Sequence, residues 1–231
     1  MCGRFVFMSK TAMLIEEFGL DEIQWNFKPN YNIAPGQDVP GIVKNGKKFL
    51  EKFRWGFIPY WADDPSIGNR MINARAESVS EKRSFARAFR KRRCLVVADG
   101  FYEWRKEGNI KIPMYFHLRS GRPFGFAGLY ETWKSKDGQE LTTCAIITTE
   151  PNELIRPVHN RMPAIIEKDK RKLWLDNAIQ NPEDLLPLLK PYNVAEMEGY
   201  EVSRKVNSFK INSPECIKPV DSIPKSFFDR Y

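Results

Sequence analysis

Short apolar stretches separated by turn residues follow one another along most of this 231-residue chain. Stretches of this length, bounded by Gly, Pro or charged residues, are typical of β-strands. Between two of them stands Asn45-Gly46, a dipeptide that favours the tight turn of a β-hairpin. The pattern predicts strands over residues 2–8, 41–44, 49–57, 93–98, 101–105, 114–118, 124–129 and 141–149.

Helical patterns are confined to shorter segments, over residues 10–18, 84–90, 168–175 and 182–189. We expect Ser9 to cap the first helix, and Asn181 to cap the last, with Pro182 at its first position. No internal repeat or low-complexity linker divides the chain. The prediction is a single-domain α+β fold with curved, mostly antiparallel, barrel-like β-sheets and peripheral helices.

Composition limits the environment of the protein. With 42% hydrophobic residues the chain can bury one sizeable core, and no apolar stretch approaches the length of a membrane span. The four cysteines show no C-x-x-C spacing and only two histidines accompany them, so we expect neither a metal site nor a disulfide framework, and no cofactor. We expect a cytoplasmic monomer without a signal peptide, associated with the nucleoid if the source is bacterial.

The net charge of +8 is concentrated in one segment. Residues 70–93 contain nine Lys or Arg against two Glu, and the aromatic side chains Trp55, Phe57, Tyr60 and Trp61 precede them. One interpretation is the solvated face of a short helix. The combination of cations with aromatic rings favours a surface that follows phosphates while bases stack, so we predict a nucleic-acid partner.

The most reactive candidate is Cys2. Cysteine is small, so we expect Met1 to be removed, which leaves an α-amine and a thiol on one residue. An α-amine is about 10 to 20% neutral at pH 7, far more than a lysine, and therefore forms imines readily with aldehydes. The thiol can then close a five-membered thiazolidine ring, a favourable intramolecular step. The alternative is that Cys2 only begins a buried strand.

Three further polar residues lie at turns and strand ends. Asn73 lies near the start of the basic segment and could hold the backbone of Cys2 or an aldehyde oxygen; the alternative is an ordinary turn residue. Glu103 stands between Tyr102 and Trp104, where apolar surroundings would raise the pKa of its carboxyl, unless it is simply exposed. His159 lies in a loop bounded by two prolines and is a candidate for acid–base chemistry.

These residues belong to stretches that resemble the SRAP (SOS response-associated peptidase) family, whose members process abasic sites. Six such stretches occur in the family's order and cover roughly residues 1–220, which we take as the domain, with 221–231 as a C-terminal tail. They are Met-Cys-Gly-Arg-Phe at 1–5, Tyr-Asn-Ile-Ala-Pro at 31–35, Trp-Gly-Phe-Ile-Pro at 55–59, Asn-Ala-Arg-Ala-Glu at 73–77, Asp-Gly-Phe-Tyr-Glu-Trp at 99–104 and His-Asn-Arg-Met-Pro at 159–163.

The resemblance implies covalent capture of abasic sites in single-stranded DNA, in the response to DNA damage. Cys2 would form a Schiff base at C1′ and then a thiazolidine, while Asn73 positions it, Glu103 transfers protons and His159 helps to open the sugar. A minor lyase activity and autoproteolytic removal of Met1 are also implied, and replication or repair proteins are possible partners. The residues implied for DNA binding are Arg4, Arg75, Arg161, Trp61 and Pro35.

Two other classes of function remain open from the sequence. One is an N-terminal-nucleophile hydrolase or cysteine peptidase, in which Cys2 attacks a carbonyl group and the amine or His159 acts as its base. The other is a module that binds single-stranded DNA without a covalent bond, in which Cys2 is structural. Formation of a Cys2-dependent adduct that survives denaturation separates the covalent function from both.

Overall fold

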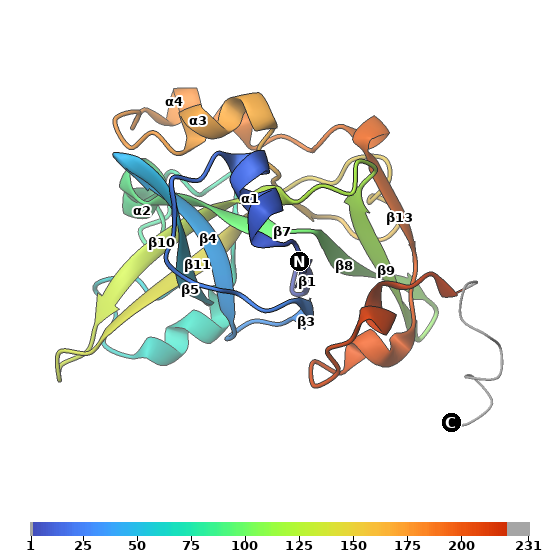
Figure 1. Cartoon of the computed structure of the whole chain (residues 1–231). Coiled ribbons are helices and arrows are strands. Elements are labelled where there is room, and N and C mark those ends of the chain that lie inside the picture. Colours follow the sequence, from blue (N-terminus) through green and yellow to red (C-terminus); the bar gives the residue numbers. More distant parts are fainter. Residues whose placement is uncertain (1, 221–231) are drawn as a thin grey trace.

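The computed structural model describes residues 2–220, which form two β-sheets with short helices at their edges (Figure 1). Met1 and the predicted tail at 221–231 lie outside the described residues. In Figure 1 the larger sheet lies at the left, the smaller sheet at the right, and strand β1 between them. The start of the chain is therefore placed where the two sheets meet.

The larger sheet contains a closed ring of strands. Its main path runs β12-β11-β10-β7-β4-β5-β2, and β5 also pairs with β11 in parallel, through Arg54 with Thr143 and Trp55 with Cys144. This pairing closes β4, β5, β7, β10 and β11 into a barrel, to which β6 is added beside β11. The strands are β2 (Glu22–Ile23), β4 (Asp38–Asn45), β5 (Lys47–Trp55), β6 (Asn73–Arg75), β7 (Arg93–Ala98), β10 (Phe124–Lys134), β11 (Glu140–Thr149) and β12 (Met162–Pro163).

The smaller sheet has the strand order β13-β9-β8-β1-β3. Gly100 begins β8 where a side chain would collide with another strand, because a Cβ there would lie 2.3 Å from the hydroxyl of Tyr115. The absence of a side chain leaves room for the Tyr115 ring of β9. On its other side β8 pairs with β1, Gly100 with Val6 and Phe101 with Phe5. The strands are β1 (Phe5–Phe7), β3 (Asn30–Ile33), β8 (Gly100–Glu107), β9 (Ile110–Leu118) and β13 (Met197–Glu201).

The helices are short and lie at the edges of the sheets (Figure 1). The Asn181 side chain caps α4 as predicted, by accepting a hydrogen bond from the backbone N–H of Glu183. The predicted cap of α1 is wrong, because Lys10 occupies the N-cap position and Ser9 instead hydrogen-bonds Asp99. The α-helices are α1 (Thr11–Phe18), α2 (Ala86–Lys91), α3 (Arg171–Trp174) and α4 (Pro182–Leu185), and 3-10 turns cover Pro65–Arg70, Lys168–Lys170, Leu186–Leu188, Val194–Glu196, Arg204–Asn207 and Pro214–Ile217.

An aromatic contact joins the two sheets through the core. Phe5 of β1 packs against Trp55 of β5 and Phe126 of β10, with ring centroids 5.1 and 5.8 Å apart. The Trp55 indole is fully buried and donates to the carbonyl of Ile72, so it supports the core. The predicted α+β fold with barrel-like sheets is confirmed, and β1 is fixed in place by packing on the barrel.

One residue of the basic segment is not on the surface. The guanidinium group of Arg93 is buried and donates to backbone carbonyls at the end of α2 and around residues 174–179. Arg87 and Arg92 pair with the buried carboxylate of Glu131 at 3.6 and 2.9 Å. The prediction that this segment faces nucleic acid is therefore wrong for Arg93, which is structural.

The four cysteines are free and buried. Within residues 2–220, no helix combines the length and the apolar character that a membrane crossing requires.

Candidate active site

Cys2 is buried immediately before β1. Its carbonyl oxygen accepts a hydrogen bond from the side-chain amide of Asn73, 2.8 Å away. Burial raises the pKa of the Cys2 thiol far above its usual range, and the nearby charge of Glu103 raises it further. The thiol is therefore protonated at neutral pH, and it donates to the carbonyl of Arg4 with the sulfur 4.0 Å from the oxygen.

Asn73 holds Cys2 from the barrel side of the junction. It begins β6, which pairs in parallel with β11 through Asn73 and Ile146. Its Nδ2 binds Cys2, and its Oδ1 is buried without a hydrogen-bond partner among residues 2–220. A buried acceptor left open beside Cys2 can receive an N–H or O–H group, so the predicted positioning role fits this geometry.

Glu103 approaches Cys2 from the smaller sheet. It lies on β8, beside the point where the backbone N–H of Tyr102 donates to the carbonyl of Arg4. Its side chain is 2% exposed, so the alternative of an exposed strand residue is wrong. Burial raises the pKa of Glu103 to about 7. A carboxyl with that pKa is present in both protonation states near neutral pH, as proton transfer in both directions requires.

His159 and Glu103 line the same cavity, which has a volume of about 640 Å³. The Nδ1 atom of His159 lies 3.0 Å from the backbone nitrogen and 3.2 Å from the carbonyl oxygen of Arg161, and these contacts orient the ring. Burial lowers the pKa of His159 below its ordinary value. The ring is therefore neutral at physiological pH and can accept a proton.

The arginines predicted to bind DNA differ in their surroundings. Arg75 is exposed on β6, two residues after Asn73. Arg161 already forms a bidentate pair with Glu77, at 2.6 and 3.0 Å, and also donates to Thr148. Of these two guanidinium groups, that of Arg75 is the more available for a phosphate. DNA contact by either residue stays a prediction.

Arg4, the third arginine, is directed toward the protein. Its guanidinium donates to the side chain of Asn32 at 2.6 Å and to the carbonyl of Val206 at 2.8 Å, and it lies over the ring of Trp104. Burial lowers the pKa of Arg4. These contacts fix the chain between Cys2 and β1, so the observed role of Arg4 is structural, while its predicted phosphate contact stays untested.

Trp61 and Pro35 are exposed in loops of the barrel side. The Trp61 ring is 38% exposed and lies under the guanidinium of Arg83, 4.8 Å away. Pro35 lies in a turn that is fixed by a hydrogen bond from Gly36 to the carbonyl of Trp55. An exposed aromatic ring next to a guanidinium group is suited to base stacking. DNA binding by Trp61 and Pro35 stays a prediction.

Sequence analysis did not single out two residues that line the Glu103 cavity. Trp104 forms one wall, and its indole N–H donates to the side chain of Asn207 at 2.7 Å. Trp104 stands within a motif that the sequence had already marked, and that position was the available signal. Asn207 lies in a 3-10 turn far along the chain, where no pattern in the sequence pointed to the site.

The four predicted residues are thus brought together at the junction of the two sheets. Asn73 binds Cys2 directly, the charge of Glu103 acts on the Cys2 thiol, and Glu103 shares its cavity with His159. The arrangement combines a held nucleophile, a carboxyl that exchanges protons near pH 7 and a neutral imidazole. These groups are suited to the addition of a nucleophile to a carbonyl carbon, followed by loss of water.

Several known proteins are similar to this chain in sequence. "Abasic site processing protein YoqW" of Bacillus subtilis is 47% identical over 222 residues, which cover 94% of this chain and 99% of that protein. "Abasic site processing protein HMCES" of Gallus gallus is 30% identical and is matched over 86% of this chain and 69% of its own length.

The fold is also found among crystal structures. A protein from Bacteroides thetaiotaomicron is similar with a TM-score of 0.87 and 28% identity, over 95% of this chain and all of that one. The family model described as "SOS response associated peptidase (SRAP)" matches residues 1–209. The match includes Cys2, Asn73, Glu103 and His159, and the chain belongs to the SRAP family.

Proposed function

We propose that this protein processes abasic sites by covalent capture in single-stranded DNA, through Cys2 after removal of Met1. The observation that carries the proposal is the contact of Asn73 with Cys2 beside a buried Glu103 whose pKa is about 7. The names of the similar proteins support abasic DNA as the substrate class.

The first step is the formation of an imine. The ring-opened abasic sugar presents an aldehyde at C1′, and the lone pair of the Cys2 α-amine adds to that carbon. One proton passes from the amine nitrogen to the oxygen, protonated Glu103 donates a second, and the oxygen leaves as water to give a protonated Schiff base. Neutral His159 supports the preceding opening of the sugar as a base: it takes the proton of the C1′ hydroxyl and delivers it to the ring oxygen as the bond between C1′ and that oxygen breaks.

The second step closes the ring. The Cys2 sulfur attacks C1′, the electron pair of the C=N bond moves to nitrogen, and the thiol proton passes to the Glu103 carboxylate. No oxidant or cofactor is consumed. Closure removes the imine, which would otherwise promote β-elimination and strand cleavage, so lyase activity is expected to rise when the thiol is absent.

The raised pKa of Cys2 argues against the cysteine peptidase alternative for external substrates. Nucleophilic cysteines in such enzymes lie in electropositive surroundings that favour the thiolate. Here burial and the charge of Glu103 both oppose thiolate formation. The proposed order, in which the amine reacts first and the thiol transfers its proton during ring closure, does not require a preformed thiolate.

The test uses single-stranded DNA with one abasic site, mixed with the mature protein and resolved under denaturing conditions. Wild type is expected to form a heat-stable adduct, Cys2→Ala none, and Cys2→Ser a heat-labile one because the oxygen analogue of the ring is less stable. Borohydride should trap an imine on Cys2→Ala, whose amine remains. Cys216→Ala, which alters another buried cysteine, is the matched control. A heat-stable adduct on Cys2→Ala would overturn the proposal.

A further inference from the structure

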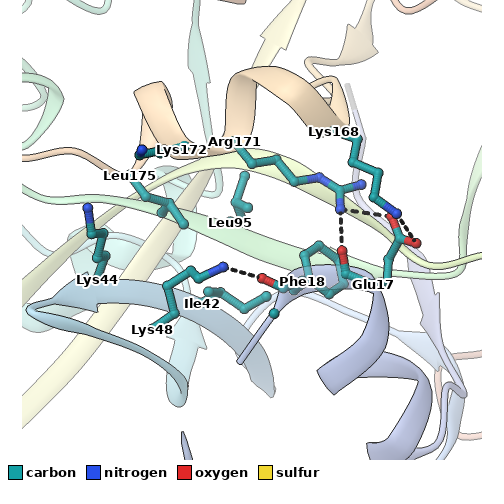
Figure 2. Close-up of a pocket in the computed structure, with 11 residues that line it drawn as sticks. Glu17, Phe18, Ile42, Lys44, Lys48, Leu95, Lys168, Arg171, Lys172 and Leu175 are labelled. Atoms are coloured by element: carbon teal, nitrogen blue, oxygen red, sulfur yellow. Dashed lines mark hydrogen bonds and ion pairs between the residues drawn. The ribbon is translucent and has the colours of Figure 1, made fainter. Parts of the chain in front are cut away.

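A second cavity lies away from the Cys2 site, between the end of α1, the strands β4, β5 and β7, and the segment 168–175 (Figure 2). Its volume is about 440 Å³, within the usual range for ligand pockets of about 300 to 1,000 Å³. None of the residues that line it also lines the cavity of Glu103 and His159. Occupation of one cavity therefore does not use the residues of the other.

The floor of this second cavity is aliphatic. Ile42, Leu95 and Leu175 form it, and all three are at most 2% exposed. Phe18 also lines the cavity, but the guanidinium of Arg171 lies over its ring, 4.5 Å from the centroid. The surface on offer suits a branched aliphatic side chain and lacks an open ring on which a base could stack.

The rim of the cavity is cationic, with Lys44, Lys48, Lys168, Arg171 and Lys172 against the single carboxylate of Glu17 (Figure 2). Three of these cations already have partners. Lys48 donates to the carbonyl of Phe18 at 2.6 Å, while Lys168 and Arg171 pair with Glu17 at 3.0 and 2.9 Å. The positive charge on the rim therefore exceeds what Glu17 neutralises.

Donors on the same rim remain unused. Neither ammonium group of Lys44 and Lys172 makes a hydrogen bond or ion pair with a side chain or carbonyl among residues 2–220. The Nε of Arg171 is buried and also has no hydrogen-bond partner in that range. A buried unsatisfied donor beside two uncommitted cations fits an anionic group bound at this rim.

We propose that this cavity is a docking site for an acidic segment of a partner protein, in which Asp or Glu residues flank an aliphatic side chain. The aliphatic side chain occupies the floor, and the carboxylates pair with Lys44 and Lys172. Single-stranded DNA would satisfy the cations but would leave the floor without a stacking surface. A free phosphate would make no use of the floor. The site provides a means of bringing a partner to the protein while the Cys2 cavity is occupied.

The experiment selects a displayed library of short random peptides on the whole chain and measures the affinity of the enriched peptides by fluorescence anisotropy. We expect enriched sequences to combine acidic and aliphatic residues and to bind more weakly as salt rises. The double variant Lys44→Glu with Lys172→Glu should bind them at least about tenfold more weakly, a change of about 1.4 kcal/mol. The double variant Lys136→Glu with Lys190→Glu, at exposed lysines outside the cavity, should bind normally.

A peptide with Ser in place of its aliphatic residue should also lose affinity. Equal binding of that peptide, or of the Lys44→Glu with Lys172→Glu variant, would overturn the proposal, as would enrichment of peptides without acids. Displacement of the peptide by an oligothymidine strand would assign the cavity to nucleic acid instead. The measurement contains no abasic DNA, so its outcome is independent of the Cys2 chemistry, and adduct formation by the double variant should remain at the wild-type rate.

Discussion

Replacement of Glu103 by Gln is expected to stabilise the folded protein at alkaline pH and to slow capture of DNA. Burial raises the pKa of Glu103 from its ordinary value of 4.5 to about 7. The folded protein therefore keeps a proton that the unfolded chain has released across this window. Because the unfolded state binds fewer protons there, the free energy of unfolding falls as pH rises from about 4.5 to about 7.

The size of this effect follows from the two pKa values. One unit of pKa corresponds to about 1.4 kcal/mol, so the full destabilisation by ionised Glu103 is about 3 kcal/mol above pH 7. The side chain is 2% exposed, and solvent screening is correspondingly weak. Gln cannot ionise, so the stability of Glu103→Gln relative to wild type should improve by about 3 kcal/mol between about pH 4.5 and about pH 8.5.

The assay is urea unfolding of both proteins across this range, with the N-terminus of each sample defined by intact mass. Glu107→Gln, an exposed carboxyl on the same strand, is the matched control and should show a much smaller change. In parallel, the rate of adduct formation by Glu103→Gln should fall by a factor of about 10² or more. A stability difference that does not vary with pH, together with an unchanged rate, would refute the assignment of Glu103.

Other predictions concern proton transfer by His159 and the contribution of Arg93 and Asn32 to the stability of the fold. His159→Gln should slow capture. It should also abolish the decrease in rate at pH values below the ordinary pKa of histidine, because the neutral ring is the active form. If that decrease is retained, His159 is not the group that causes it. Arg93→Lys should destabilise the protein to urea by about 3 kcal/mol, since buried carbonyls lose their donors, while exposed Arg90→Lys should not. Asn32→Leu should lower the free energy of unfolding by about 2 kcal/mol and make residues 204–211 accessible to protease, because Asn32 Nδ2 donates to three carbonyls there. Unchanged proteolysis would contradict this role.

Local signals in the sequence located eight of the strands but missed β2, β3, β6, β12 and β13, and the strand predicted over residues 2–8 is limited to Phe5–Phe7. β7 begins at Arg93 and ends at Ala98 as expected, and the Asn45-Gly46 turn joins β4 to β5, with Gly46 at φ 70°. These features depend on alternation and turn chemistry within a few residues. The closure of the barrel was not predictable, because the parallel pairing of Trp55 with Cys144 joins segments far apart in the chain and leaves no local pattern.

The same distinction applies to the site. Cys2, Asn73, Glu103 and His159 could be nominated because each stands in a motif, and the chemistry of a terminal aminothiol is local to one residue. The direction of a side chain is decided by packing: Arg93 was counted with the surface cations, yet it is buried beneath α2 and α3. The second cavity likewise depends on the meeting of α1 with segment 168–175, which no motif marks.

The central claim is that the amine and the sulfur of Cys2 act on the same carbon. Digestion of the heat-stable adduct followed by tandem mass spectrometry tests it most directly. The account predicts a peptide that begins at Cys2 and carries the sugar with the loss of one water, resistant to borohydride and to thiol alkylation. Attachment to a lysine, or an adduct whose Cys2 thiol is still alkylated, would contradict it.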